Sequence, residues 1–290
     1  MKVPHARAIL TLAIALLCAS CQGCPQYPIY ENQATGNTGK NAASSLTVPI
    51  PANTIGNPSG DLLIAFAALK VNPAVVGPAG WTVIPQINGF NTAICGSDDL
   101  GIACNLTAYY KIADGQEPSS IMFTWPKDAG SPRQAAGVVL RYSRIDTSAP
   151  IGAVGVQSSG SSNAPTAPAI TTTRGESRVL RIAVSEADNI RNSLTDTILS
   201  GDPATSRLNI LSFPPAAVSL ATGCGPPLSG CSYTNEAVGL AISDDGQKDI
   251  GPSGTASWTL PGTEQWLGVT LEIKKPASSG VVVTLSLPRS

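Results

Sequence analysis

The strongest constraint on the fold is an uninterrupted run of eight apolar residues, Leu62–Leu69. Turn-forming residues close it on both sides: Asn-Pro-Ser-Gly occupies positions 57–60, and Asn-Pro occupies positions 72–73. A run this short between such residues is typical of a β-strand that is buried on both faces, and not of a helix. The pattern therefore predicts a central strand that the rest of the chain must cover from two sides.

The chain begins with a sequence typical of exported proteins. A basic start precedes an apolar stretch at positions 8–17, which is too short to span a bilayer, and small residues follow it. We expect residues 1–20 to be a signal peptide. The end of this segment resembles the lipobox of bacterial lipoproteins, although Cys18 stands where that motif usually has Leu. Cys21 is therefore the predicted lipid anchor, and ordinary cleavage with full secretion is the alternative.

The charge balance limits the partners. The chain has 18 Lys and Arg against 19 Asp and Glu, and loss of the leader would remove Lys2, Arg7 and the only histidine, His5. The net charge of the mature chain is then about −3. Without a basic cluster, the release of counterions that drives nucleic-acid binding is missing. We expect no nucleic-acid partner, membrane contact only through a lipid anchor, and a location at the outer membrane, at the cell surface or outside the cell.

Short apolar or alternating runs, each closed by Gly, Pro, Asn or Asp, fill most of the chain. We expect residues 46–275 to form a single jelly-roll-like antiparallel β-sandwich. Residues 21–45 are polar and are predicted to be a flexible tether. Residues 276–290 are predicted to be a tail, in which Val281–Leu287 has the length of one extra strand. The predicted strands cover residues 46–50, 61–69, 81–87, 106–113, 121–125, 135–145, 151–157, 167–173, 178–186, 207–213, 237–243, 255–260 and 265–274.

Two of these strands define a weak internal repeat. At an offset of about 131 residues, the strand at 265–274 aligns with the strand at 135–145. Alternation places Leu267, Val269, Leu271 and Ile273 on one face of the later strand and Ala136, Val138, Leu140 and Tyr142 on one face of the earlier. The same offset aligns Asp245-Gly246-Gln247 with Asp114-Gly115-Gln116.

The repeat predicts two halves, residues 46–146 and 167–275. They can form one sandwich of two interleaved halves or two small sandwiches in tandem. We favour the single sandwich, because the run Leu62–Leu69 needs cover on both faces and one core of this size is ordinary for an all-β chain.

Four cysteines occupy equivalent places in the two halves. Cys95 and Cys104 precede one predicted strand, and Cys224 and Cys231 precede its counterpart. Because an exported protein meets oxidising conditions, we expect disulfide bonds within each pair. Pairing between the halves stays open, since the sequence does not fix the connectivity.

Five segments of the chain share a pattern with other proteins. They are Gly-Asp-Leu-Leu-Ile-Ala-Phe at 60–66, Pro-Ala-Gly-Trp-Thr at 78–82, the stretch 109–118, Phe-Thr-Trp at 123–125 and Gly-Val-Val-Leu-Arg-Tyr at 137–142. These segments resemble an uncharacterised bacterial jelly-roll domain that occurs in secreted proteins and in phage-associated or tail-like structural proteins. The resemblance is good from Gly60 to Ile151 and thinner as far as Lys275. It implies a sandwich outside the cytoplasm and brings no catalytic motif.

Familiar enzyme chemistries lack a partner in this sequence. Ser-His-Asp and Cys-His hydrolases need an imidazole, and His5 lies in the leader. Asp146-Thr147-Ser148 is close to the Asp-Thr-Gly of aspartic proteases, but the second half has no matching Asp, so we interpret it as a turn. Glu186-Ala187-Asp188 begins the Glu-x-Asp-x-x-Glu strand motif of jelly-roll glucanases, but Arg191 replaces the third carboxylate. We therefore expect no catalytic residue.

Metal and ligand sites are also weakly indicated. Asp244-Asp245-Gly246 with Asp249, and Asp98-Asp99, offer carboxylates to calcium, but neither follows a recognised loop spacing and both are typical of turns. We expect no metal and no cofactor. Tyr109 is the best candidate for an exposed aromatic that binds sugar. The four tryptophans are predicted to belong to the core: Trp81, Trp125, Trp258 and Trp266.

These features favour a non-catalytic protein, secreted or lipid-anchored, that binds a glycan or another cell-surface polymer or has a role in structural display. The first alternative is a virion or tail-like structural module. The leader argues against it, because virion proteins assemble in the cytoplasm. The second alternative is a jelly-roll glycoside hydrolase, against which the incomplete carboxylate motif argues.

The lipid anchor can be tested directly. Cys21→Ser, or treatment of cells with globomycin, should change the mass of the processed protein and release it from the membrane fraction. Mass spectrometry and membrane fractionation measure the two effects. An unchanged mass together with unchanged partitioning would show that Cys21 carries no lipid.

Overall fold

The computed structural model describes residues 27–38, 43–54, 58–70, 75–88, 104–126, 134–155, 158–187, 195–197, 205–211, 237–260 and 263–277. Within these ranges every regular element is a β-strand, and the paired strands run antiparallel. The all-β antiparallel class predicted from the sequence is therefore confirmed. Over the same ranges, no helix has the length and apolar character needed to cross a membrane.

The first sheet is built around the apolar run that dominates the sequence. This run forms β3 (Leu62–Lys70), and every residue from Leu62 to Leu69 is completely buried. The prediction of a central strand covered on both faces is confirmed. The sheet has five strands, in the order β1 (Ile29–Asn37), β7 (Ala135–Ser143), β3, β5 (Cys104–Ile112) and β4 (Thr82–Asn88).

The second sheet is built around β11 (Ser177–Ala187) in the same manner. β14 pairs with one edge of this strand, and β16 pairs with the other. The six strands of the sheet are β13 (Thr205–Leu211), β14 (Ala237–Gln247), β11, β16 (Glu264–Ile273) and, both along the far edge of β16, β8 (Ile151–Val154) and β9 (Ser158–Ser162).

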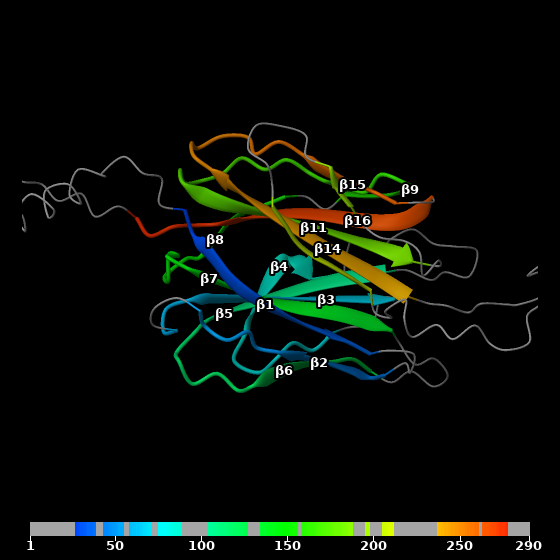
Figure 1. The fold of residues 1–290 in the computed structure, drawn as a ribbon, viewed down its shortest axis with the longest axis horizontal. Helices are drawn as coiled ribbons and strands as arrows, with labels where there is room; N and C mark the ends of the chain where they lie inside the picture. Colours follow the sequence, from blue (N-terminus) through cyan, green and yellow to red (C-terminus); the bar gives the residue numbers. More distant parts are fainter. Residues whose placement is uncertain are drawn as a thin grey trace, which may run out of the picture.

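Two small sheets cover the outer faces of the large ones, so the body has four layers (Figure 1). Over the first sheet, β2 (Ser45–Pro49) pairs with β6 (Ser120–Thr124), and their Leu46 and Phe123 pack with Leu63 of β3. Over the second sheet lie β10 (Thr166–Ala167), β15 (Ala256–Thr259) and β12 (Thr195–Thr197). Trp258 of β15 packs there with Ala183 and Ala241.

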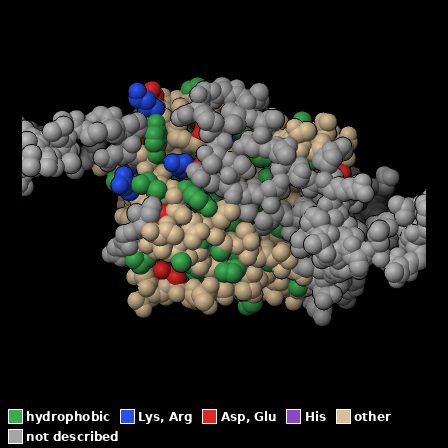
Figure 2. Space-filling view, in the orientation of Figure 1, with side chains coloured by type: hydrophobic (Ala, Val, Ile, Leu, Met, Phe, Trp, Pro, Cys, Tyr) green, Lys and Arg blue, Asp and Glu red, His purple; other side chains and the backbone are tan. Residues whose placement is uncertain are grey.

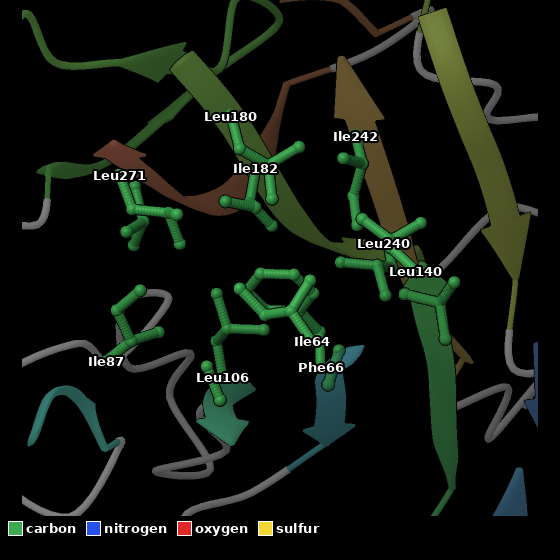
Figure 3. Packing of buried hydrophobic residues seen from close by; sticks show 14 of the residues in the cluster. Ile64, Phe66, Ile87, Leu106, Leu140, Leu180, Ile182, Leu240, Ile242 and Leu271 are labelled. Carbon is green, nitrogen blue, oxygen red and sulfur yellow. The ribbon is translucent and has the colours of Figure 1, made fainter. Parts of the chain in front are cut away.

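The principal core lies between the two large sheets. Ile64 and Phe66 of β3 belong to the same buried cluster as Ile182 of β11 and Leu240 of β14, and their side chains point into one shared space (Figure 3). The residues that alternation assigned to one face of β7 and of β16 all lie in this cluster: Ala136, Val138, Leu140, Tyr142, Leu267, Val269, Leu271 and Ile273. The predicted orientation of both strands is confirmed.

The two halves of the chain have the same topology, which confirms the internal repeat. The position of β1 in the first half is taken by β8 and β9 together in the second. The other equivalent strands are β2 and β10, β3 and β11, β4 and β13, β5 and β14, β6 and β15, and β7 and β16. The registers agree as well, because Ile64 of β3 faces Leu140 of β7 as Leu180 of β11 faces Leu271 of β16. Leu140 and Leu271 are a pair that the sequence alignment had matched.

The halves are not interleaved, however, and this part of the prediction is wrong. Each half forms its own large sheet and its own cover, and the two large sheets then share one core. Pairing of strands that are near in sequence costs less loop entropy than pairing between halves. The proposed match of Asp114–Gln116 with Asp245–Gln247 is also wrong: β5 ends at Ile112 before a turn, whereas β14 continues to Gln247.

A further correction concerns the tether predicted at residues 21–45, because Ile29–Asn37 forms β1 and pairs with β7 along its whole length. An edge strand needs only backbone hydrogen bonds on one side, so its polar residues need not alternate with apolar ones. Tyr30 fixes the strand further through an edge-to-face contact with the ring of Tyr142, at 5.7 Å between centroids. The predicted extra strand Val281–Leu287 lies outside the described residues.

A buried polar contact joins the two sheets to the start of β1. The hydroxyl of Tyr142, in the first sheet, donates to Oδ2 of Asp244, in the second, at 2.7 Å. Arg178 donates through Nη1 to Oδ1 of the same carboxylate at 2.9 Å and through Nε to the carbonyl of Pro28 at 2.7 Å. Because the Asp244 side chain is completely buried, the two bonds that it accepts, from Tyr142 and from Nη1 of Arg178, replace hydration that the carboxylate has lost.

Removal of the Tyr142 hydroxyl should destabilise the protein. Tyr142→Phe leaves Oδ2 of the buried Asp244 without this donor, so we expect the free energy of unfolding to fall by about 1–3 kcal/mol. Urea unfolding of the mature protein measures the change. Tyr110→Phe is the matched control, because the half-buried Tyr110 packs against the same core and its hydroxyl has no hydrogen-bond partner among the described residues. Equal stability of Tyr142→Phe and the control would show that the contact contributes nothing.

Candidate functional site

A pocket of about 460 Å³ opens at one end of the body. This end, the pocket end, is where β3 and β11 begin and where β7, β14 and β16 finish. Figure 2 shows Lys and Arg side chains gathered on the same side of the molecule as the start of β1 and the segment that follows β16 in Figure 1. The pocket is lined by Arg174, Gly175, Glu176, Lys248, Asp249, Lys275 and Ala277, and we call it the Arg174 pocket.

The floor of the pocket is held in place by a buried carboxylate. Glu272 of β16 is completely buried and accepts hydrogen bonds from the backbone N–H groups of Thr173 and Arg174 at 2.9 and 3.0 Å. The hydroxyl of Ser177 and the N–H of Ala153 also donate to it, at 2.7 and 2.9 Å. Burial acts to raise the pKa of Glu272, but these hydrogen bonds outweigh it and hold the pKa below its ordinary value. The segment that carries Arg174 is thereby fixed to β16.

Arg174 itself is oriented by two acceptors. Its Nη1 donates to Oδ2 of Asp146 and to the carbonyl of Lys275, both at 2.7 Å. Asp146 also accepts from the hydroxyl of Ser148 at 2.6 Å, and this bond, with the Arg174 guanidinium and the backbone N–H groups of Ser148 and Ala149, holds the pKa of Asp146 well below its ordinary value. The guanidinium therefore sits against a carboxylate that stays ionised at neutral pH.

The other charged side chains of the pocket differ in whether they have a partner. Lys275 forms an ion pair with Glu176, whose backbone N–H donates to the carbonyl of Lys248 at 2.8 Å. The side chains of Lys248 and Asp249 contact no partner within the described ranges. The site thus offers a ligand the ammonium group of Lys248, the carboxylate of Asp249, and Nε and Nη2 of Arg174. Such a set can form hydrogen bonds and ion pairs with a charged ligand.

The structure reassigns two carboxylates that the sequence placed in a turn or a calcium site. Asp244 and Asp245 lie inside β14, where Asp244 pairs with Arg178 and Asp245 with Arg181. Burial raises the pKa of Asp245 despite the Arg181 charge. Each carboxylate has an arginine partner inside the strand, so the interpretation of Asp244 and Asp245 as turn residues is wrong. Asp98-Asp99 lies outside the described residues.

Tyr109 is not the exposed sugar-binding aromatic that the sequence suggested. Only 8% of the residue is exposed, its hydroxyl donates to the carbonyl of Val75 at 3.2 Å, and its ring contacts Phe123 at 5.9 Å between centroids. The small β2–β6 sheet and the chain around Gly77 cover the face that would otherwise meet solvent. The prediction that tryptophans lie in the core is confirmed for Trp125, Trp258 and Trp266, whereas Trp81 is half-buried.

Other predicted site residues have mixed outcomes. The turn at Asp146-Thr147-Ser148 is confirmed, since Oδ1 of Asp146 accepts from the backbone N–H of Ser148 at 3.0 Å. Glu186 is the next-to-last residue of β11, whereas Asp188 and Arg191 lie outside the described residues. Cys104 is disulfide-bonded, but the other cysteines named above lie outside the described residues, so both pairings and the Cys21 anchor stay predictions.

Comparison with known proteins adds no family to this description: no family model, no curated protein and no solved structure matches the chain.

Substitution of Glu272 should destabilise the floor of the pocket in a pH-dependent way. Glu272→Gln puts an amide N–H₂ where several donors converge, so we expect a loss of about 1–3 kcal/mol in the free energy of unfolding at pH 7. Because the pKa of Glu272 is lowered in the folded state, its stabilisation is present above the ordinary pKa of 4.5 and is lost as pH falls through the folded value.

Denaturant titrations of both proteins between pH 7 and pH 3 measure this dependence. The difference between wild type and Glu272→Gln should narrow as the pH falls below 4.5. Asp249→Asn, at an exposed carboxylate without a described partner, should stay within about 0.5 kcal/mol of wild type at pH 7. A difference that is constant over the whole range would contradict the assignment to the Glu272 carboxylate.

Proposed function

We propose that this chain is a non-catalytic protein of the cell surface, secreted or lipid-anchored at Cys21, that acts by binding a glycan or another surface polymer. The Arg174 pocket is the place of binding. It is open to solvent and lined by groups that form hydrogen bonds and ion pairs, which suits a segment of a polar polymer better than a small apolar ligand. A rigid body of paired strands would hold this site in a fixed shape.

The finer fold assignment belongs to the same proposal. Two large antiparallel sheets that share one core, with small sheets over their outer faces, support a β-sandwich. The resemblance of residues 60–151 to the bacterial domain suggests that the sandwich has a jelly-roll-like topology. A sandwich of this kind can carry binding, display or catalysis, so the function has to be argued from the site.

The observation that carries the proposal is the state of the carboxylates around the pocket. Glycoside hydrolysis needs two carboxyl groups that face the same bond, one of them able to give up a proton. Here Glu176 is paired with Lys275, Asp146 is paired with Arg174, and Glu272 is buried under donors. Only Asp249 lines the pocket without a partner in the described part of the chain. Binding therefore explains these groups better than hydrolysis does.

Structural display is the second candidate, and it covers the virion or tail-like module as well. Its support is the sharing of one core by both halves, with complete burial of the central strand of the first. This arrangement gives a stiff body whatever the pocket does. The predicted leader at residues 1–20 disfavours assembly inside the cytoplasm and so favours display at the cell surface over a virion.

The mature protein should bind surface polymers and turn over none of them. Retention on immobilised cell-wall polymers and on a glycan array measures binding, and release of reducing sugar, peptide or alcohol measures turnover. We expect retention of the mature Cys21→Ser protein with a Kd in about the micromolar to millimolar range, since an open pocket buries little of its ligand. Glycan turnover that is abolished by Glu186→Gln or Asp188→Asn would contradict the non-catalytic assignment. Failure to bind any polymer would leave structural display as the function.

A further inference from the structure

The internal repeat shows what is special about the Arg174 pocket. In each half the chain enters the central strand through a tight turn, with Gly60 before β3 and Glu176 before β11, and both residues have positive φ, at 93° and 55°. The N–H of Gly60 donates to the carbonyl of Ala113 at 2.8 Å, as the N–H of Glu176 donates to that of Lys248. The two turns are thus similar, and by the register of the paired strands Lys248 occupies the place of Asp114.

The same equivalence places Arg174 where the first half has Pro58, two residues before the turn residue. The second half therefore carries two cationic side chains at positions where the first half has a proline and an exposed aspartate. The backbone turn does not require these cations, because the first half forms it without them. Glu176 also keeps a left-handed backbone conformation, which a glycine would adopt without strain.

The two cations have complementary properties. Arg174 is oriented by Asp146 and the carbonyl of Lys275 through Nη1 alone, which leaves Nε and Nη2 of its planar fork without a described partner. A fork held in this manner can bind a carboxylate or phosphate group with little further ordering. Lys248 is exposed and unpaired within the described residues, so its ammonium adds a mobile positive charge at the same opening.

We propose that the Arg174 pocket binds the acidic group of an anionic surface polymer, with Arg174 as the oriented contact and Lys248 as the charge contact. The inference rests on the proposed function and names the class of polymer. Three basic and two acidic side chains line the pocket, and Lys275 and Arg174 are paired with Glu176 and Asp146. Lys248 is then the one basic side chain of the pocket without a partner among the described residues, which suits isolated acidic groups spaced along a polymer, and not the dense charge of a nucleic acid.

Retention of the full mature chain on immobilised polymers tests the proposal. The probes are polygalacturonate, which carries carboxylates, poly(glycerol phosphate), which carries phosphodiesters, and neutral dextran. Arg174→Gln and Lys248→Gln should each weaken binding to at least one acidic polymer by about tenfold, the loss expected for one charged hydrogen bond. Lys111→Gln is the matched control: it removes one positive charge from the same end of the first half, where Lys111 is paired with Asp114. It should change binding by less than about twofold.

Each outcome decides the question. Lys248→Gln keeps the test valid if Arg174→Gln proves unstable, because the exposed Lys248 side chain pairs with no other described residue. Equal losses for Lys248→Gln and Lys111→Gln would reduce the effect to net charge and overturn the pocket. Retention on dextran but on neither acidic polymer would overturn this inference and leave the proposed function standing. Retention on none of the three polymers, and on no polymer of the wider panel, would remove both.

Discussion

Burial of the strand Leu62–Leu69 on both faces determines the layered architecture. One apolar face of β3 requires a second large sheet, and the other requires the β2–β6 cover. The repeat gives β11 the same two-sided burial, but the outer face of the second sheet is only partly apolar. Beside the cluster around Trp258 it buries the polar residues Arg181, Ser185, Thr270 and Glu272. Buried polar groups need partners, and the segments before and after the strands of the second half supply them. The pocket is built from those segments.

Polar burial also fixes how the two sheets meet. Apolar side chains across a flat interface tolerate small shifts, whereas the bond from Tyr142 to Asp244 allows one register between the sheets. Arg178 extends this contact to Pro28 and so ties β1 to the second sheet as well as to the first. Only 13% of the residues in the chain are charged, and several of them are buried inside strands, where they form polar contacts of this kind. Their role is to specify one arrangement of two otherwise similar halves.

The sequence predicts the parts of this fold that rest on local apolar patterns. The central strand, the core-facing sides of β7 and β16, and the repeat all follow from alternation and spacing, and the structure agrees with each. Three edge strands escape prediction: β1 is mostly polar, β9 consists only of Ser and Gly, and β12 has only three residues, Thr-Asp-Thr. Such strands are held by backbone hydrogen bonds, which leave no periodic signal in the side chains. The opposite error concerns residues 168–173, for which the sequence predicts a strand. In the structure the regular strand β10 ends at Ala167, and these residues are mostly irregular.

The pocket could not be predicted because three segments far apart in the sequence contribute to it. Arg174, Lys248 and Lys275 meet only after the second sheet has formed, and each looks like an ordinary residue at the end of a strand. Glu272 carried a signal that could have been used. It stands among Leu267, Val269, Leu271 and Ile273 in a strand with few charges, and a carboxylate there has to be either solvated or bound by several donors. The prediction that Tyr109 is exposed was wrong for a related reason. Alternation gave the correct face of β5 for its side chain but could not show that a second layer covers that face.

The strand β1 changes the picture of how the molecule would stand at a membrane. A tether from Cys21 to residue 45 would have let the body diffuse well away from the bilayer, but β1 already begins at Ile29. Tyr27 is six residues after Cys21, and a chain of that length spans at most about 20 Å in any conformation. Tyr27 packs against Gly246 at the pocket end, so this end would point toward the lipid head groups. A molecule anchored at Cys21 would therefore meet its ligand in the thin zone directly above the bilayer, and polymers rooted in the membrane would reach it before those of the outer wall.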